Sequence, residues 1–194
     1  MNERYQLRGV RIGAVIAIAA VAAFLVWFFA IRDTGDNNNN TTGGPGKSSS
    51  NVVGPVAATQ VDVADLAKKN DQPVYWAGKQ AGTTDIELTQ TADGNVYVRY
   101  LTDDTSIGTP KPSYLTVGTY PFGNAIHALD TIAKQPGAKT FKVPNHGTAV
   151  QNSSSPTSVY LAYPDEKGFE IEVYDPDPAT ALDLVKSGDI KPVR

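Results

Sequence analysis

The stretch SVYLAYPDEKGFEIEVY, residues 158–174, predicts two neighbouring β-strands. Apolar side chains occupy every second position of each strand: Val159, Leu161 and Tyr163, then Phe169, Ile171 and Val173. A period of two is typical of a strand with one face in a core. We therefore expect these residues to form a core, and we expect Glu170 and Glu172 to lie on an opposite, polar face that is left to water.

The sequence before this stretch contains further strands and helices of the same domain. Extended runs are predicted at Val74–Trp76, Asp85–Thr91, Val96–Leu101, Tyr114–Tyr120 and Thr148–Gln151. Asp93-Gly94 joins the second and third runs, and Asp-Gly is a strong signal for a β-hairpin. Helical spacing of apolar residues predicts helices at Asp62–Asn70, Ala125–Lys134 and Pro178–Lys186. Asp62 is expected to cap the first helix, and Asp177, followed by a proline, the third.

Short sequences recur in the same order in the two halves of this region. Val96–Tyr100 (VYVRY) resembles Val159–Tyr163 (VYLAY), and Ala128–Asp130 repeats as Ala181–Asp183. The shared order of three strands and a helix predicts an α+β domain made of two βββα repeats, with an antiparallel sheet covered by helices. Chance recurrence of tyrosine and valine strings is the alternative explanation.

The N-terminal region contains an apolar run that predicts a membrane anchor. Residues 12–31 (IGAVIAIAAVAAFLVWFFAI) carry no charge, and a helix of this length spans roughly 30 Å, the thickness of the hydrocarbon core. Arg4, Arg8 and Arg11 precede the run, so residues 1–11 are expected to be a cytoplasmic tail. A cleaved secretory signal is the alternative, but the run exceeds the usual length of about 7–15 residues and ends in bulky aromatic residues.

The residues after the apolar run are expected to lie outside the cytoplasm, at the cell membrane. Residues 32–51 are rich in Asn, Gly and Ser and predict a disordered linker. Residues 52–194 form the predicted extracytoplasmic domain. The chain has no cysteine, so a hydrophobic core without disulfides must hold this domain together. The domain has 17 acidic and 12 basic residues, which argues against nucleic acid as a partner.

No group of residues predicts catalysis, a cofactor or a metal. His127 and His146 are the only histidines, and no spacing gives either one a set of metal ligands. His146 lies in the turn-like sequence PNHG and would matter only if a carboxylate and a serine converged on it. Residues 43–47 (GGPGK) resemble a phosphate loop but fall in the linker, without the flanking strand and helix. We therefore predict no catalytic residue, no cofactor and no bound metal.

Aromatic residues are the best candidates for ligand binding. Tyr97 and Tyr160 fall on the strand faces opposite the valines, and Tyr75 and Trp76 share one short strand. Exposed aromatic faces on a sheet bind peptides, glycans or partner proteins. The alternative is that these rings simply pack on half-buried strands.

Several longer motifs carry a resemblance to known proteins. They are residues 73–78 (PVYWAG), 98–101 (VRYL), 115–121 (LTVGTYP) and 156–164 (PTSVYLAYP). In these residues the chain resembles a group of uncharacterised actinobacterial membrane proteins that have one N-terminal span and an extracytoplasmic domain. The resemblance implies a bacterial cell-envelope setting and assigns no chemistry to any residue.

Taken together, the sequence predicts a single-pass envelope protein. The lipid bilayer is the expected partner of residues 12–31, and an envelope protein or cell-wall component that of the outer domain. A non-enzymatic binding module is the leading interpretation, because no catalytic set is visible. An extracytoplasmic hydrolase, with a site assembled around His146 only in the fold, is the alternative.

Overall fold

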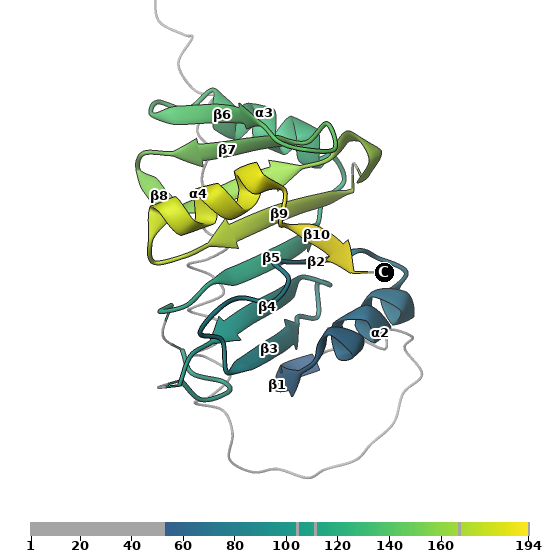
Figure 1. Cartoon of the computed structure of the whole chain (residues 1–194). Helices are drawn as coiled ribbons and strands as arrows, with labels where there is room; N and C mark the ends of the chain where they lie inside the picture. The colour runs from purple at the N-terminus through teal and green to yellow at the C-terminus, as the bar shows by residue number, and fades with distance from the viewer. Residues whose placement is uncertain (1–52, 104, 111, 167, 194) are drawn as a thin grey trace, which may run out of the picture. The chain divides into compact units, whose positions relative to one another are not determined.

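The computed structural model describes residues 53–103, 105–110, 112–166 and 168–193, which form an α+β domain (Figure 1). The predicted cytoplasmic tail 1–11, transmembrane helix 12–31 and linker 32–51 lie outside the described residues. Within those residues, no helix is both long enough and apolar enough to cross a bilayer.

Strands make up most of the domain. They are β1 (Val53–Ala58), β2 (Val74–Trp76), β3 (Asp85–Gln90), β4 (Val96–Leu101), β5 (Thr116–Pro121), β6 (Ala138–Lys142), β7 (Thr148–Asn152), β8 (Ser155–Ala162), β9 (Phe169–Tyr174) and β10 (Lys191–Val193). The helices are α2 (Gln60–Asn70), α3 (Ala125–Ala133) and α4 (Pro178–Ser187), with a 3-10 turn η1 (Pro164–Glu166). Every predicted strand and helix is therefore confirmed in type, with ends that shift by a few residues.

Eight strands form one sheet in the order β1-β3-β4-β5-β9-β8-β7-β6. Every neighbouring pair in it is antiparallel, which confirms the predicted antiparallel α+β architecture. The strands β5 and β9 meet at the centre, so segments about fifty residues apart in sequence form the middle of the sheet (Figure 1). A second, two-stranded sheet pairs β10 with β2.

Three strands, β1, β6 and β10, were not predicted. β1 and β6 are the two edges of the large sheet, and most of their side chains are exposed or half-buried. Edge strands of this kind lack a continuous apolar face, and β1 also contains Gly54 and Pro55, which discourage a strand assignment from sequence. β10 has only three residues and is a strand because it pairs with β2.

The start of α2 also differs from the prediction. Thr59, not Asp62, is the N-cap, and its side chain accepts from the backbone amide of Asp62. Asp62 lies in the first turn of the helix and accepts from the Thr59 backbone amide at 2.7 Å. The two residues form a capping box, which satisfies two otherwise unpaired amides.

One face of the large sheet, which we call the core face, carries the main hydrophobic core. Val98, Val117, Leu161 and Ile171 belong to it, and each is completely buried. Apolar residues of α2 and α4 pack in the same core, together with β2. The predicted alternation in residues 158–174 is confirmed for the core residues Val159, Leu161, Tyr163, Ile171 and Val173. The prediction was wrong for Phe169, which is half-buried and lines a groove instead of the core.

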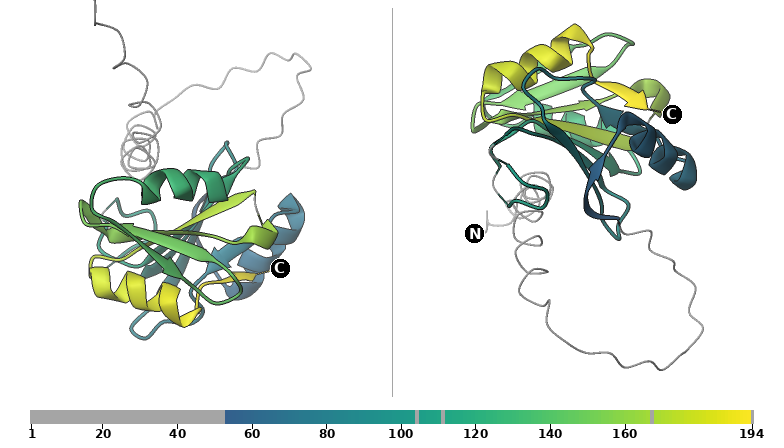
Figure 2. Two further views of the ribbon diagram at one scale, coloured as in Figure 1. Left: turned by 90° about the horizontal axis from the view of Figure 1, so that it is seen from above. Right: turned by 60° about the horizontal axis from the view of Figure 1, so that its bottom comes forward.

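The opposite face, which we call the tyrosine face, carries Tyr97, Gly118, Tyr160 and Glu172. The helix α3 packs over its β6–β9 part, whereas α4 packs on β8 and β9 from the core face. Figure 2 shows the two helices on opposite sides of the sheet. If a two-fold axis perpendicular to the sheet related the two halves of the domain, α3 and α4 would lie on the same face of the sheet. Because they lie on opposite faces, no such axis relates the two halves when their helices are included.

The tyrosine face is buried, contrary to the expectation of a polar face left to water. Glu170 and Glu172 expose only 7 % and 2 % of their surface. We expected the alternating glutamates to be solvated, because charged residues on a strand usually face water. This expectation was wrong because α3 covers part of this face and large tyrosine side chains surround the carboxyl groups.

Candidate functional site

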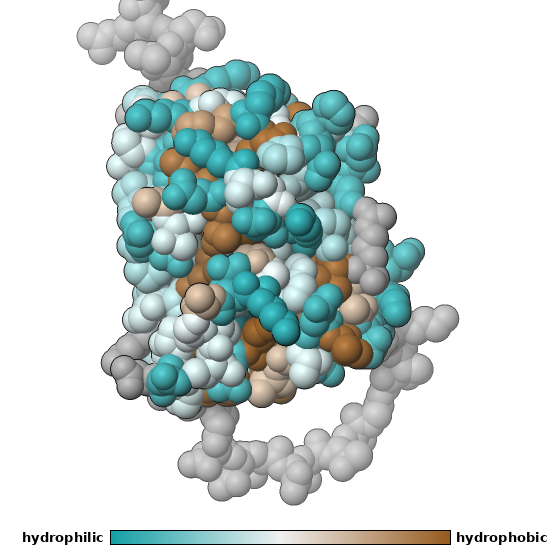
Figure 3. Space-filling model, in the orientation of Figure 1, coloured by the Kyte–Doolittle hydropathy of each residue, from teal (hydrophilic) through white to brown (hydrophobic). Residues whose placement is uncertain are grey.

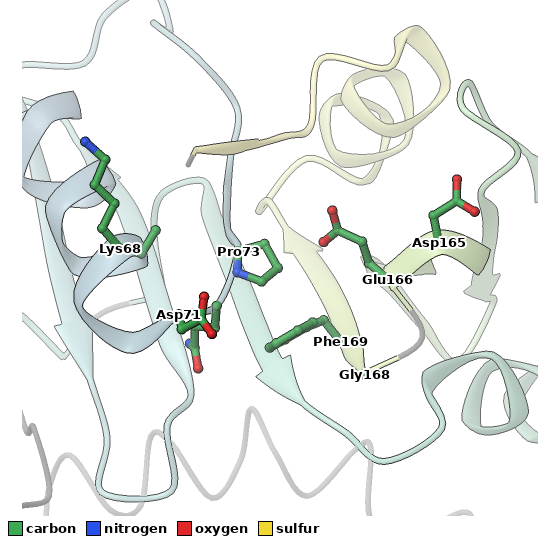
Figure 4. Close-up of a pocket in the computed structure, with 9 residues that line it drawn as sticks. Lys68, Asp71, Pro73, Asp165, Glu166, Gly168 and Phe169 are labelled. Carbon is green, nitrogen blue, oxygen red and sulfur yellow. The ribbon is translucent and has the colours of Figure 1, made fainter.

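A groove of about 510 Å³ lies between the end of α2 and the η1–β9 segment (Figure 4). Its lining residues come from two segments far apart in sequence: Ala67, Lys68, Asp71, Gln72 and Pro73, then Asp165, Glu166, Gly168 and Phe169. Ligand sites commonly measure about 300–1,000 Å³ and combine an apolar surface with a few polar groups. The groove has this size, and four of its nine lining residues are charged.

Glu166 is a charged group of the groove that is bound to a residue of the core. It is half-buried, and the Tyr75 hydroxyl donates to its Oε2 at 3.0 Å. Tyr75 itself is 1 % exposed and belongs to the main core, where its ring stacks on the Tyr163 ring with the centroids 5.6 Å apart. The Tyr75 backbone amide also donates to Thr119 Oγ1 at 2.9 Å. The core of the domain therefore orients a carboxylate of the groove from behind.

Asp71 provides a second carboxylate on the other wall. It ends α2 in the left-handed region, with φ of 50°, and its backbone amide caps the helix by donating to helix carbonyls. Figure 4 shows Asp71 and Glu166 on either side of Pro73, and the ammonium group of Lys68 directed away from that proline. Pro73 and Phe169, both half-buried, provide apolar surface between the charges.

The tyrosine face holds a second cluster, around the carboxyl group of Glu172. The Tyr120 hydroxyl donates to Oε2 and the Ser158 hydroxyl to Oε1, both at 2.7 Å. Tyr160 is the direct cross-strand neighbour of Glu172 on β8. Burial raises the pKa of Glu172, and the hydrogen bonds from these hydroxyls act in the opposite direction.

Glu170 lies two positions before Glu172 and therefore on the same face of β9. Burial raises its pKa to about 7, and the neighbouring Glu172 carboxylate adds to the rise. Glu170 is directly opposite Tyr120 on β5. The face thus contains a carboxyl group whose pKa is raised to about 7, beside one that accepts a hydrogen bond from a hydroxyl group on each of its oxygens.

Gly118 makes room for this cluster. It lies directly opposite Glu172 in the register of β5 and β9. A Cβ atom placed on Gly118 would come within 2.7 Å of the Tyr120 hydroxyl and 2.8 Å of its ring. The Tyr120 side chain therefore lies across the space that a glycine leaves, and from there its hydroxyl reaches Glu172.

A buried ion pair fixes the next part of the tyrosine face. Arg99 and Glu87 are direct cross-strand neighbours on β4 and β3, and Arg99 Nη1 donates to Glu87 Oε1. The Gly108 backbone amide donates to the other oxygen of Glu87, and Arg99 Nη2 donates to the Thr109 carbonyl at 2.7 Å. Arg99 also contacts the hydroxyl and ring of Tyr114. These bonds attach the β4–β5 connection to the sheet.

The structure separates the four aromatic residues that the sequence singled out. Tyr97 and Tyr160 share the tyrosine face, where each belongs to the cross-strand row that contains Gly118 and Glu172. They are only 5 % and 7 % exposed, so they do not form the expected exposed aromatic surface. Tyr75 is buried behind the groove, and Trp76 is half-buried in β2.

The histidines occupy exposed positions. His127 lies on the exposed side of α3, and His146 lies in the predicted turn, with φ of 60°. Among the residues that the structure describes, no group of His, Asp and Glu side chains has an arrangement that could hold a metal ion. Asp177 caps α4 as predicted, because its side chain accepts from the Ala179 amide at 3.0 Å.

Several residues of both clusters were missed by the sequence analysis. Glu170 and Glu172 were assigned to the correct face, but the interpretation of that face as solvated hid their environment. Tyr97 and Tyr160 were also assigned to strand faces away from the valines. Large aromatic side chains on the same kind of face as the glutamates were the available signal that this face is buried. No local signal links Asp71 to Glu166, since the fold alone brings their segments together.

Comparisons with known proteins found no matching family model, no matching curated protein and no matching solved structure.

Proposed function

We propose that the chain is a single-pass protein of the bacterial cell envelope whose outer domain, residues 52–194, is a non-enzymatic binding module. The groove between α2 and η1 carries this proposal, because an oriented carboxylate, further charged groups and apolar surface line one opening. Such a surface suits recognition of a partner protein or wall component. The partner contacts the domain at Asp71, Glu166 and Phe169.

The anchor and its orientation are part of the proposal. Residues 12–31 are uncharged and long enough to span the bilayer, and three arginines precede them. In this orientation the domain lies outside the cytoplasm, and the polar linker 32–51 joins it to the anchor. The resemblance of residues 73–78 and 156–164 to actinobacterial envelope proteins supports this location.

A duplication of the strands is a further part of the proposal. In the order of the large sheet, β3, β4 and β5 are followed by β9, β8 and β7, so β5 and β9 are neighbours and the two segments extend from them in opposite directions. The matched sequences Val96–Tyr100 and Val159–Tyr163 fall on β4 and β8, which are the middle strands of these segments. The opposite placement of α3 and α4 limits this proposal to the strands.

A hydrolase is the second candidate function. The observation that favours it is the pair Glu170 and Glu172, because a carboxyl group with a pKa of about 7 is suited to general acid–base work. His146 does not support this function, since it is exposed in a turn.

The absence of native cysteine allows a direct test of the topology. A Ser49→Cys variant is expected to react with a membrane-impermeant maleimide on intact cells, and an Asn2→Cys variant only after lysis. The two variants are matched, since each carries one thiol on the same chain. Labelling of residue 2 on intact cells, or a mature protein that lacks residues 1–31, would contradict the proposed anchor.

Site-specific photocrosslinking tests the binding function. A benzoylphenylalanine at position 169 in the groove is expected to form a defined adduct in living cells. The matched control is the same residue at position 56, because Val56 is 44 % exposed on the edge strand β1 and does not line the groove. Absence of an adduct at position 169, or the same adducts at both positions, would overturn the proposal.

A further inference from the structure

The helix α3 covers part of the tyrosine face and is attached to the rest of the domain near its two ends. Before the helix, the Phe122 backbone amide donates to the Gly168 carbonyl at 2.7 Å. After it, the Asn152 side chain donates to the Pro136 carbonyl at 3.2 Å. Between these points, the hydrogen bonds that the structure describes for residues 123–134 stay within α3 and the residues beside it in the chain. We call residues 123–134 the flap.

Apolar contact holds the flap on the sheet. The buried side chains of α3 are Ala125, Leu129 and Ile132, and the helix packs on β7, β8 and β9. α3 has nine residues, and an isolated helix shorter than about 12–15 residues is marginal in water. The strands below it are held more firmly, because β7, β8 and β9 each pair with a strand on either side. The flap is therefore the part of this face that opens at the lowest cost.

The core face is covered differently. Residues of α2, α4 and β2 share one hydrophobic core on that side, whereas α3 lies on the other side of the sheet (Figure 2). Figure 3, which displays the side with α4, shows apolar areas that are interrupted by hydrophilic side chains. Opening of the flap would expose the tyrosine face and leave this core in place.

An ionisable side chain without a hydrogen bond lies on the covered face. Glu170 is 7 % exposed and belongs to β9, on which α3 packs. Its carboxyl group accepts no hydrogen bond from any residue that the structure describes, whereas each oxygen of Glu172 accepts one. An ionised carboxylate that is buried without a partner costs far more free energy than its neutral form. The closed flap therefore favours the protonated form of Glu170.

The groups around Glu170 do not compensate a negative charge. Tyr120 lies directly opposite it on β5, and burial raises the pKa of the Tyr120 hydroxyl well above 10, so this hydroxyl stays neutral. Among the described residues, no lysine or arginine forms an ion pair with Glu170. The other titratable groups of β9 and of the elements packed on it are Glu172, Tyr174, Tyr160 of β8, His127 and Asp130 of α3, and, on the core side, Asp183 and Lys186 of α4. His127 and Asp130 are exposed on the flap.

We propose that α3 is a pH-dependent flap, which packs on the tyrosine face while Glu170 is neutral and leaves that face when Glu170 ionises. Opening brings water to the carboxylate and so removes the cost of burying its charge. Burial raises the pKa of Glu170 to about 7, which puts the change near neutral pH. The inference goes beyond the proposed binding function and does not depend on it, since no residue of α3 lines the groove.

Two single-cysteine variants test the flap, because the chain has no native cysteine. Val150→Cys places a thiol on β7 at the tyrosine face, opposite Tyr160, and Val159→Cys places one on β8 in the core. Both valines are completely buried, and the substitution is the same at both. The full-length protein in detergent is labelled with N-ethylmaleimide, and each rate is divided by the rate of the same variant unfolded in urea at the same pH.

The relative labelling rate of Val150→Cys is expected to rise at least about tenfold between about pH 5 and about pH 8.5. At the higher pH it is expected to exceed that of Val159→Cys at least about tenfold, because opening of the flap exposes one thiol and global unfolding exposes both. Adding Glu170→Gln to Val150→Cys is expected to hold the rise below about twofold, since the amide does not ionise. Melting curves establish that each variant is folded.

Hydrogen exchange of the unsubstituted chain provides a second measurement. The amides of α3 are expected to gain exchange with pH, relative to their intrinsic rates, and to exchange faster than those of α4 at about pH 8.5. Equal labelling of the two thiols would show that the domain opens only as a whole, and would overturn the inference. A labelling rate of Val150→Cys that is independent of pH, or a rise that persists with Glu170→Gln, would overturn it as well.

Discussion

Replacement of Arg99 by methionine is expected to destabilise the domain by about 3–5 kcal/mol, the usual cost of leaving a buried charge without its partner. Glu87 is completely buried and Arg99 is 4 % exposed, so water cannot replace the lost guanidinium. The variant also loses the hydrogen bond from Arg99 Nη2 to the Thr109 carbonyl. Urea denaturation followed by circular dichroism measures the change in unfolding free energy.

The control for this prediction replaces both partners. A Glu87→Leu, Arg99→Met double variant is expected to recover most of the lost stability, because replacing a whole buried ion pair by apolar residues is often nearly neutral. The two single variants and the double variant form a thermodynamic cycle that isolates the interaction of the pair. A double variant as unstable as Arg99→Met would show that the attachment of the β4–β5 connection, and not the buried charge, determines the stability.

Much of the secondary structure could be predicted because its signals are local. The alternation in residues 169–173 reflects a strand with two different faces, whatever covers them. Asp177 and Pro178 start a helix through bonds and dihedral angles within one turn. The edge strand β6 gave no such signal, because three of its five residues are exposed and its strand geometry depends on pairing with β7.

The environment of each face could not be predicted, because it depends on distant segments. Glu172 is enclosed by Tyr120 from β5 and Ser158 from β8, and Gly118 leaves the space that Tyr120 fills. The alternation in the sequence shows that the Glu172 side chain lies on the face of the sheet away from the core. It does not show that α3 and the tyrosine rings cover that face.

The groove is a stronger case of the same limitation. Asp71 and Glu166 are more than ninety positions apart, and each looks like an ordinary surface acid within its own segment. Tyr75 was selected from the sequence as an aromatic binding residue. In the structure its ring belongs to the core, and its hydroxyl reaches the groove through Glu166. The sequence analysis selected Tyr75 for its aromatic ring, whereas the structure shows that its hydroxyl is the group that contacts a residue of the groove.

The stability of the domain is expected to fall as the pH rises from about 4.5 to about 7. The pKa of Glu170 rises from 4.5 in the unfolded chain to about 7 in the folded domain, first because of burial and then because of the Glu172 carboxylate. Between these values the folded state binds more protons than the unfolded state, so raising the pH favours unfolding. The full loss from this one group is roughly 3 kcal/mol, at about 1.4 kcal/mol per unit of pKa.

A Glu170→Gln variant separates this effect from the other titrating groups. The amide is neutral at every pH, so the variant is expected to be more stable than the natural protein at pH 8, by up to roughly 3 kcal/mol, and similar to it near pH 4. Urea denaturation at several pH values measures both curves, and Asp183→Asn, an exposed control, is expected to keep the natural slope. Because Glu170 and Glu172 share one face of β9, a proton that leaves Glu170 creates a negative charge beside a second buried carboxyl group among tyrosines. Parallel curves for the natural protein and Glu170→Gln would mean that Glu170 is already charged at acidic pH, and the case for this pair as a general acid–base group would end there.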